Sequence, residues 1–365
     1  MAKVRRRSAE QFEAPADNGF FGPGSVTWKV WGYPTSVLTG FQRSVTVEEL
    51  DPHLIAAVEA SGGVRERPRS RYDRTLRYFA LMVFGDTATT AKAADVLVKV
   101  HSKAIGTDPV TGRRYDANAS DSQLWIHMTA WHSILYCYER FGPGPLPPEE
   151  EAQYWLECAR SAELQTIDPA DVPRSREEVR AYFEQWRPRL AGSEAAQSMT
   201  AFLLRGDVIF PEDMPWWQRP AGRLLARAVR MQTIATYPGW MRRMFGLRQP
   251  RIVDWVVTVL SRPAYRVVHR LPRVQLTIMR IISPSTVPIA AVPLLGIPAR
   301  SQVTMTPREA QARYGYDVPA RAHLDLRARQ EQRVFGSGEA PSDEGLVESE
   351  SQLGSLDPGR AGIPA

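Results

Sequence analysis

The sequence predicts a mostly helical protein whose two ends are flexible tails. Segments with apolar residues at helical spacing recur along the chain and are bounded by Gly, Pro and Asp, whereas alternating runs typical of strands are few. Hydrophobic residues make up 43% and charged residues 24% of the 365 residues, as in ordinary globular proteins. The composition therefore excludes collagen-like, coiled-coil and wholly disordered proteins.

The two ends of the chain carry little that could form a core. Residues 1–18 have no apolar stretch after their basic residues, and residues 336–365 have no aromatic side chain and are rich in Gly, Ser, Glu and Pro. Such segments bury too little apolar area to offset the cost of ordering them. We expect a disordered tail over 1–18 and a disordered acidic tail over 336–365.

Three segments of the body have clear helix signals. The segments 71–84, 87–105 and 121–141 each stop at a glycine, which commonly ends helices. Asp86 is suited to cap the second of them. A long loop, 106–120, connects the second to the third. Further helices are expected near 148–165, 174–187, 193–204, 219–235, 238–247, 251–261 and 264–282.

Positive charge is concentrated in residues 214–300. This segment has fourteen arginines, no lysine and a single acid, Asp254, although the net charge of the whole chain is only +6. Its arginines alternate with apolar residues and with Trp216, Trp217, Trp240 and Trp255, a composition typical of helices that lie on an anionic membrane. Solvated helix faces that offset the acidic remainder explain the charge equally well. The apolar content and the absence of lysine argue against nucleic-acid binding.

The sequence also predicts a cytoplasmic location, with peripheral membrane contact as an option. No secretory signal and no apolar run of about 20 residues is present. The two cysteines, Cys137 and Cys158, have no C-x-x-C spacing, so neither a disulfide framework nor a zinc module is expected. Dinucleotide-binding, P-loop and nucleophile-elbow motifs are absent as well.

His101 is the first residue suited to carry chemistry. Ala94, Val98, His101 and Ile105 share one face of their expected helix, so the imidazole lies within an apolar stripe. A core histidine bonded to a carbonyl is the simplest interpretation. An axial ligand of haem iron, which needs a neutral imidazole in an apolar pocket, is the alternative.

The preceding helix presents polar residues on one face. Arg71, Arg74, Thr75 and Tyr78 follow one another at helical spacing. A solvated helix edge accounts for the two arginines, since long basic side chains extend toward water. Alternatively, their guanidinium groups could hold a pair of carboxylates such as haem propionates.

The third helix places His127 and Trp131 on one side, which resembles a pocket wall. His132 lies five residues beyond His127, a spacing that puts the two imidazoles on different faces and excludes a helical zinc pair. Aromatic packing is the alternative for the tryptophans. Cys137 is expected to be an inert helical cysteine.

These residues fall within an ordered set of short motifs. The chain has Phe-Gly-Pro-Gly-Ser at 21–25, Arg-Tyr-Asp-Arg-Thr at 71–75, Phe-Gly-Asp at 84–86, His101 with Gly106, Tyr115 with Ala117, and Trp-Ile-His at 125–127; a weaker part is Pro-Gly-Trp-Met-Arg at 238–242 with Phe-Gly-Leu at 245–247. In order and spacing, the set resembles the MpaB-type oxygenase family, which includes the catalytic domain of latex-clearing rubber oxygenases.

The resemblance implies a globin-like all-α fold around haem b. A haem-binding domain would cover 19–250, and a basic, apolar helical extension over 251–335 would pack on it. His101 would be the proximal iron ligand. Cofactor-binding residues would be Arg71, Arg74, Thr75, Tyr78 and His127, and catalytic residues would be Arg74, Thr75 and His127.

Two positions depart from the family. A lysine of the rubber-cleaving branch, able to ligate iron distally, is replaced by Arg74, which stays protonated and cannot be a ligand. Where many members have histidine before proline, this chain has Asp51 before Pro52, and His53 follows one residue later. The group that handles protons on the oxygen-binding side is therefore unassigned.

The resemblance implies a haem-dependent oxygenase that acts on an apolar, isoprenoid- or lipid-like compound with dioxygen and an unidentified electron donor. The alternative is a protein that binds haem or an apolar ligand without turnover.

Overall fold

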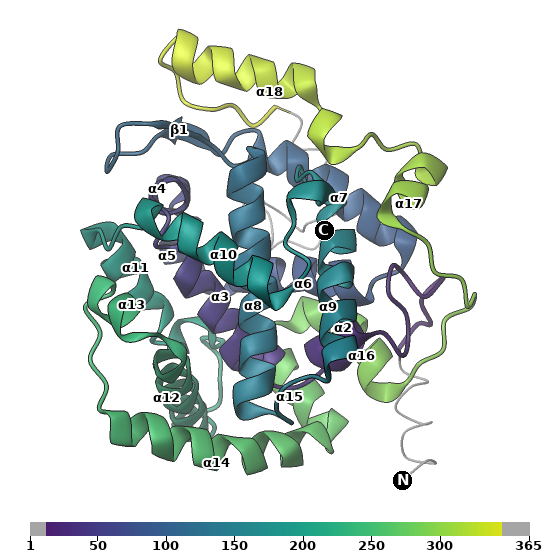
Figure 1. Cartoon of the computed structure of the whole chain (residues 1–365), viewed down its shortest axis with the longest axis vertical. Helices are drawn as coiled ribbons and strands as arrows, with labels where there is room; N and C mark the ends of the chain where they lie inside the picture. The colour runs from purple at the N-terminus through teal and green to yellow at the C-terminus, as the bar shows by residue number, and fades with distance from the viewer. Residues whose placement is uncertain (1–11, 345–365) are drawn as a thin grey trace.

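The computed structural model describes residues 12–344 and confirms the all-α class. Figure 1 shows helices arranged around a long central one, α8, with additional helices at every side. In the first half of the chain the α-helices are α2 Val26–Trp31, α3 Phe41–Glu48, α4 Pro52–Ser61, α5 Gly63–Glu66, α6 Pro68–Phe84, α7 Thr87–His101, α8 Ser120–Phe141 and α9 Pro148–Ala162. In the second half they are α10 Arg176–Trp186, α11 Glu194–Leu203, α12 Arg219–Thr236, α13 Gly239–Met244, α14 Arg251–His269, α15 Pro272–Ile282, α16 Val287–Leu295, α17 Pro307–Tyr314 and α18 Leu324–Glu331.

Short elements join these helices. The π-helical turns are η1 Ser36–Gly40 and η7 Gln332–Gly336. The 3-10 turns are η2 Pro169–Asp171, η3 Arg187–Arg189, η4 Asp207–Ile209, η5 Pro284–Thr286 and η6 Pro319–Arg321, and the two strands are β1 Ile105–Thr107 and β2 Arg114–Asp116.

Helix α8 is the centre of the core. It packs against η1, α2, α3, α9 and α14, and its aromatic residues Trp125, Trp131 and Phe141 are at most 1% exposed. A helix with neighbours on every side must be apolar nearly all round. This property explains why its tryptophans and tyrosines are so evenly distributed along its length.

The expected loop 106–120 contains a small hairpin. Helix α7 ends at His101, four residues before the expected end, and Ile105–Thr107 pairs antiparallel with Arg114–Asp116. Gly106 lies opposite Tyr115, and a Cβ on Gly106 would come within 2.6 Å of the Tyr115 hydroxyl. A glycine at 106 is therefore required by the tyrosine that crosses it.

Pro263 does not interrupt its helix as expected. Helix α14 runs through Pro263 to His269, and the break comes at Leu271, before Pro272. Pro263 is exposed, so water can bond the carbonyl group that a proline leaves without its helical donor. The basic extension then continues as α15 and α16, which pack on α6.

Ordered structure begins before the expected boundary at residue 19. Asp17 is buried and accepts hydrogen bonds from the backbone amides of Gly19 and Thr87, both at 2.9 Å. At the other end, Gln330 bonds Ser342 in the expected tail. The remainder of both expected tails, 1–11 and 345–365, lies outside the described residues.

Among residues 12–344, no helix combines the length and the apolar character needed to cross a membrane.

Candidate functional site

The site is built on α6, whose ends are fixed by sequence. Pro68 occupies the first helical position, which suits a residue without an amide hydrogen, and Gly85 follows the last residue. Arg71 is exposed by surface area, whereas Arg74 and Tyr78 are half-buried. The predicted polar face of this helix therefore has access to solvent or to a ligand.

His101 is placed by α7, the next helix. The carboxylate of Asp86 accepts a hydrogen bond from the Thr89 amide and caps the start of α7, as predicted. His101 is the last residue of this helix, and its Nδ1 lies 3.1 Å from Nε2 of Gln123 in the first turn of α8. The same Gln123 nitrogen donates to the carbonyl oxygen of Ala117 at 2.5 Å.

The electrostatics of His101 and Arg71 indicate a shared recess. Burial, together with the positive charge of Arg71, lowers the pKa of His101 to about 4. Burial also lowers the pKa of Arg71, with the charge of Arg74 adding to the effect. Both side chains nevertheless keep accessible surface. The surrounding protein therefore desolvates both groups without closing them off from solvent, and we call the place that they share the recess.

One buried glutamate, Glu49, interacts with the charge of Arg71, and Glu48 is its buried neighbour in the chain. Glu49, which follows α3, is 4% exposed, and its Oε2 has no hydrogen-bond partner among the described residues. Burial and the charge of Glu48 raise the pKa of Glu49 well above the ordinary value, and Arg71 opposes this rise. Burial likewise raises the pKa of Glu48 to about 7, although hydrogen bonds from Ser44 and Thr129 oppose the rise.

These residues fit the haem group that the family resemblance implies. At neutral pH His101 is an uncharged imidazole, the form that binds iron. The charge of Arg71 acts on His101 and that of Arg74 acts on Arg71, so positive charge suited to carboxylates is gathered near the imidazole. The hydroxyl group of Tyr78 is buried without a partner among residues 12–344, so it has a free donor for a ligand.

A cluster of protein ligands is a different kind of site, and the structure lacks one. Within the part of the chain described, no three or more His, Cys, Asp or Glu side chains are grouped to hold a metal ion. Haem binding through one imidazole needs no such group.

Gln123 determines which nitrogen of His101 carries the proton. With the amide of Gln123 donating to Nδ1, the proton of the neutral ring is on Nε2. Iron binding through Nε2 needs the proton on Nδ1, and Gln123 must then turn its carbonyl oxygen toward the ring. This reorientation would also release the hydrogen bond to Ala117.

His127 is placed in a different environment. It is fully buried, its Nε2 is 2.9 Å from the Cys158 carbonyl oxygen, and its Nδ1 is 3.0 Å from Nε2 of Gln165. Burial lowers its pKa to about 4. Both ring nitrogens therefore have partners, as in a satisfied core histidine, and the catalytic role of His127 stays a prediction.

The hydroxyl group of Thr75 also has a hydrogen-bond partner within the protein. Its hydroxyl group donates to the carbonyl oxygen of Arg71 at 2.9 Å, the usual intrahelical bond of threonine. The predicted roles of Thr75 and Arg74 at the cofactor stay predictions. Burial raises the pKa of Tyr78, so its hydroxyl keeps its proton.

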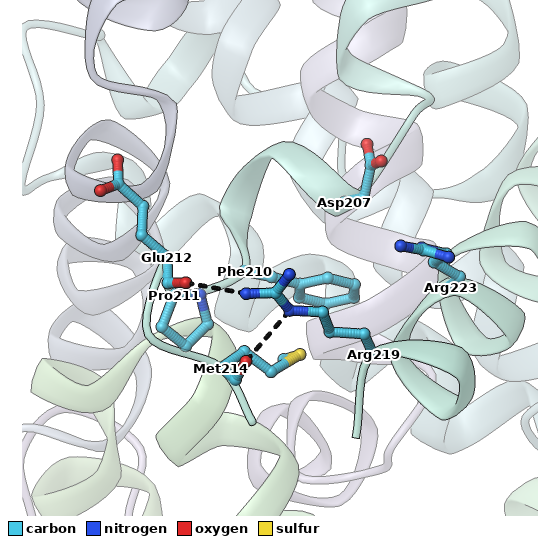
Figure 2. Close-up of a pocket in the computed structure, with 7 residues that line it drawn as sticks. All are labelled: Asp207, Phe210, Pro211, Glu212, Met214, Arg219 and Arg223. Carbon is cyan, nitrogen blue, oxygen red and sulfur yellow. Dashed lines mark hydrogen bonds between the residues drawn. The ribbon is translucent and has the colours of Figure 1, made fainter. Parts of the chain in front are cut away.

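Two other hollows lie away from these residues. One, of about 250 Å³, lies before α12, where Arg219 bonds the carbonyl oxygens of Met214 and Glu212 at 3.1 and 3.3 Å (Figure 2). The second, of about 640 Å³, lies between the hairpin and α18, with His53 and Phe335 in its wall. Neither is lined by a predicted site residue, and in the first the guanidinium of Arg219 is already bonded to backbone oxygens.

Sequence reasoning missed Gln123 and Glu49. Gln123 lies one helical turn before His127, but its partner His101 is on another helix. Glu49 is next to Glu48 in the sequence, and apolar residues flank the pair. Two adjacent acids among apolar residues are the sequence pattern that could have indicated a buried carboxyl group.

The fold and the recess together define an all-α protein with an uncharged interior imidazole beside arginines. The chain matches the family model described as "ER-bound oxygenase mpaB/B'/Rubber oxygenase, catalytic domain" over residues 28–271. The chain therefore belongs to this family of oxygenase catalytic domains.

The matched region runs from α2 to the end of α14 and passes the expected domain boundary at 250. No curated protein and no solved structure matches the chain.

Proposed function

We propose that the protein is a haem b-dependent oxygenase with His101 as the proximal iron ligand. The observation that carries this proposal is an accessible imidazole whose pKa is held near 4 by burial and by the charge of Arg71. An imidazole kept neutral and accessible inside a helical protein is suited to a metal centre. Bound haem would supply the one-electron and dioxygen chemistry that protein side chains lack.

The side chains of the recess would divide the remaining tasks. Arg71 and Arg74 would hold the two carboxylates of the cofactor, since guanidinium groups form paired hydrogen bonds with them. The raised pKa of Glu49 would keep a proton on its carboxyl group at neutral pH, beside Arg71. This carboxyl group is our candidate for the proton-handling residue that the sequence left unassigned.

The substrate would be an apolar compound of isoprenoid or lipid type. We propose that the protein meets it at an anionic membrane surface, as a cytoplasmic protein bound peripherally, because residues 214–300 combine fourteen arginines with apolar side chains. An electron donor is still required.

A second function is ligand binding without turnover. The observation that favours it is that His127 and Thr75, two of the three predicted catalytic residues, already have hydrogen-bond partners within the protein. Such a protein would store or sense haem or an apolar molecule.

Oxygen uptake separates the two functions. The haem-loaded protein is mixed with a reductant and polyprenyl substrates, and oxygen consumption is followed with an electrode together with product formation by mass spectrometry. The oxygenase should consume oxygen in step with product, and His101→Ala should not. A haem-loaded protein that consumes no oxygen with any polyprenyl compound would favour the binding function.

A further inference from the structure

Helix α14 is built with its apolar side outward. It runs along the lower edge of the molecule in Figure 1. Trp255 is 63% exposed and Leu260 is 64% exposed. The exposed apolar residues of the helix are Ile252, Trp255, Val256, Val259, Leu260, Pro263 and Val267. At 100° per residue these positions form one continuous stripe.

The inward side of α14 carries polar groups beside the buried Val257. The hydroxyl group of Tyr265 bonds Gln232 at 2.7 Å and Thr39 at 2.8 Å, and Ser261 accepts from Gln232 at 2.9 Å. Asp254 is held at 2.7 Å by Arg242. Hydrogen bonds and an ion pair thus help to attach the helix to the protein, and the exposed apolar residues take no part in that attachment.

The basic segment to which α14 belongs carries charge almost entirely of one sign. The exposed Arg251, Arg262 and Arg266 lie along one border of the apolar stripe. Asp254 is the single acid between Met214 and Arg300, and it is engaged by Arg242 inside the fold. A cationic border beside an exposed apolar stripe is the pattern of a helix that lies in the headgroup region of a bilayer.

We propose that α14 is the membrane-docking element of this protein and inserts its apolar stripe into a bilayer that contains anionic lipids. Trp255 and Leu260 enter the boundary between headgroups and acyl chains. Arg251, Arg262 and Arg266 meet lipid phosphates while their methylene stems lie on the apolar surface. This inference rests on the proposed membrane association and is independent of the haem chemistry.

The charge argues against a second copy of the chain as the occupant. Pairing two α14 helices through this face would bring the arginine borders of both copies together without acids to offset them, and like charges across an interface are repulsive.

Among the four tryptophans of the basic segment, Trp240 takes no part in this surface, because it packs under the guanidinium of Arg187 at 4.6 Å. Trp255 is the tryptophan of the α14 stripe and is therefore the one to probe.

The test is co-sedimentation of the full chain with vesicles, using a pair of matched variants. Leu260→Glu places a charge in the stripe, and Leu324→Glu makes the same change on α18, where Leu324 is 53% exposed at the opposite edge of the molecule (Figure 1). The vesicles contain phosphatidylcholine alone or with phosphatidylserine. Size-exclusion chromatography of all variants reports the oligomeric state.

We expect binding to the phosphatidylserine vesicles, weakened by added salt. Leu260→Glu should reduce the partition coefficient by roughly tenfold to a hundredfold, and Leu324→Glu should leave it unchanged. Brominated lipids should quench wild-type fluorescence more than that of Trp255→Phe, which locates the indole in the bilayer.

Three results would overturn the proposal, and they are distinguishable. If Leu260→Glu binds vesicles as well as wild type does, the protein still associates with membranes, but α14 is not the element that docks. No binding by any form would remove the membrane association as well. A wild-type dimer that Leu260→Glu converts to a monomer, without vesicle binding, would make this face a subunit interface. The haem absorbance of Leu260→Glu should equal that of wild type in each case.

Discussion

The chemistry of His101 depends on two neighbours from other elements. Arg71 of α6 and the surrounding protein hold its pKa near 4, and Gln123 of α8 lies 3.1 Å from its Nδ1. The apolar stripe of the sequence indicated that this imidazole faces inward. It could not indicate Gln123, because that contact exists only when α7 and α8 are packed together.

We expect Gln123→Ala to weaken haem binding by about tenfold to a hundredfold, the usual cost of losing a partner of a metal-binding histidine. Haem titration followed by absorbance measures the affinity. Gln165→Ala is the matched control, because Gln165 makes the corresponding contact with Nδ1 of His127 at 3.0 Å. Equal losses in both variants would show a general packing effect instead of a role in orienting His101.

Glu48 should make stability depend on pH. The folded protein raises its pKa from 4.5 to about 7, so the folded state disfavours the charged form. Stability from this group is fully present below pH 4.5 and is lost as pH rises through 7. Glu48→Gln should therefore be more stable than wild type at pH 8, by up to roughly 3 kcal/mol, and nearly equal to it at pH 4. Urea unfolding at the two pH values measures the difference, and a variant less stable at pH 8 contradicts the assignment.

At the scale of elements, helix α7 is attached to the N-terminal segment. The carboxylate of Asp17 accepts from the amides of Gly19 and Thr87 and from the Thr87 hydroxyl group at 2.5 Å. The composition of residues 1–18 predicted a tail, since it shows too few apolar residues. The Asp17 carboxylate with its three donors, together with backbone hydrogen bonds between residues 15–18 and 300–303, orders the end of this segment, and composition does not report such bonds.

We expect Asp17→Ala to lower the free energy of unfolding by roughly 2 to 3 kcal/mol, because a charged acceptor is removed from three donors. Asp86→Ala removes a half-buried helix cap at the same end of α7 and should cost about 1 kcal/mol. Denaturant unfolding of both variants checks the order. A smaller loss for Asp17→Ala than for Asp86→Ala would contradict the anchoring role of Asp17.

The apolar period predicted helix α14 but not the direction of its face. An apolar stripe normally turns toward the core, and here the polar residues do so, because Thr39 of η1 and Gln232 of α12 offer hydrogen bonds to Tyr265. Those partners lie far from α14 in the sequence. The face that α14 turns inward is therefore set by contacts that form only when the protein is folded.

At the scale of the whole molecule, helical periodicity and end signals predicted the all-α class and most of the helices from α6 to α15. The small hairpin was not predicted, because strands of three residues are too short to show an alternating pattern in the sequence. The motif order led to the oxygenase family, which the match over 28–271 confirms. The recess was only partly predictable: His101, Arg71 and Arg74 stand in motifs, whereas Glu49 and Gln123 join it by packing.

Haem loading of the purified protein tests the central claim most directly. Wild-type protein expressed with ample haem precursor is purified, its visible spectrum is recorded, and its haem content is measured as the pyridine haemochrome. Our account predicts a Soret band with about one haem per chain, and loss of that band in His101→Ala while its far-ultraviolet circular dichroism stays that of wild type. A folded, colourless wild-type protein, or a His101→Ala variant with an unchanged Soret band, would contradict it.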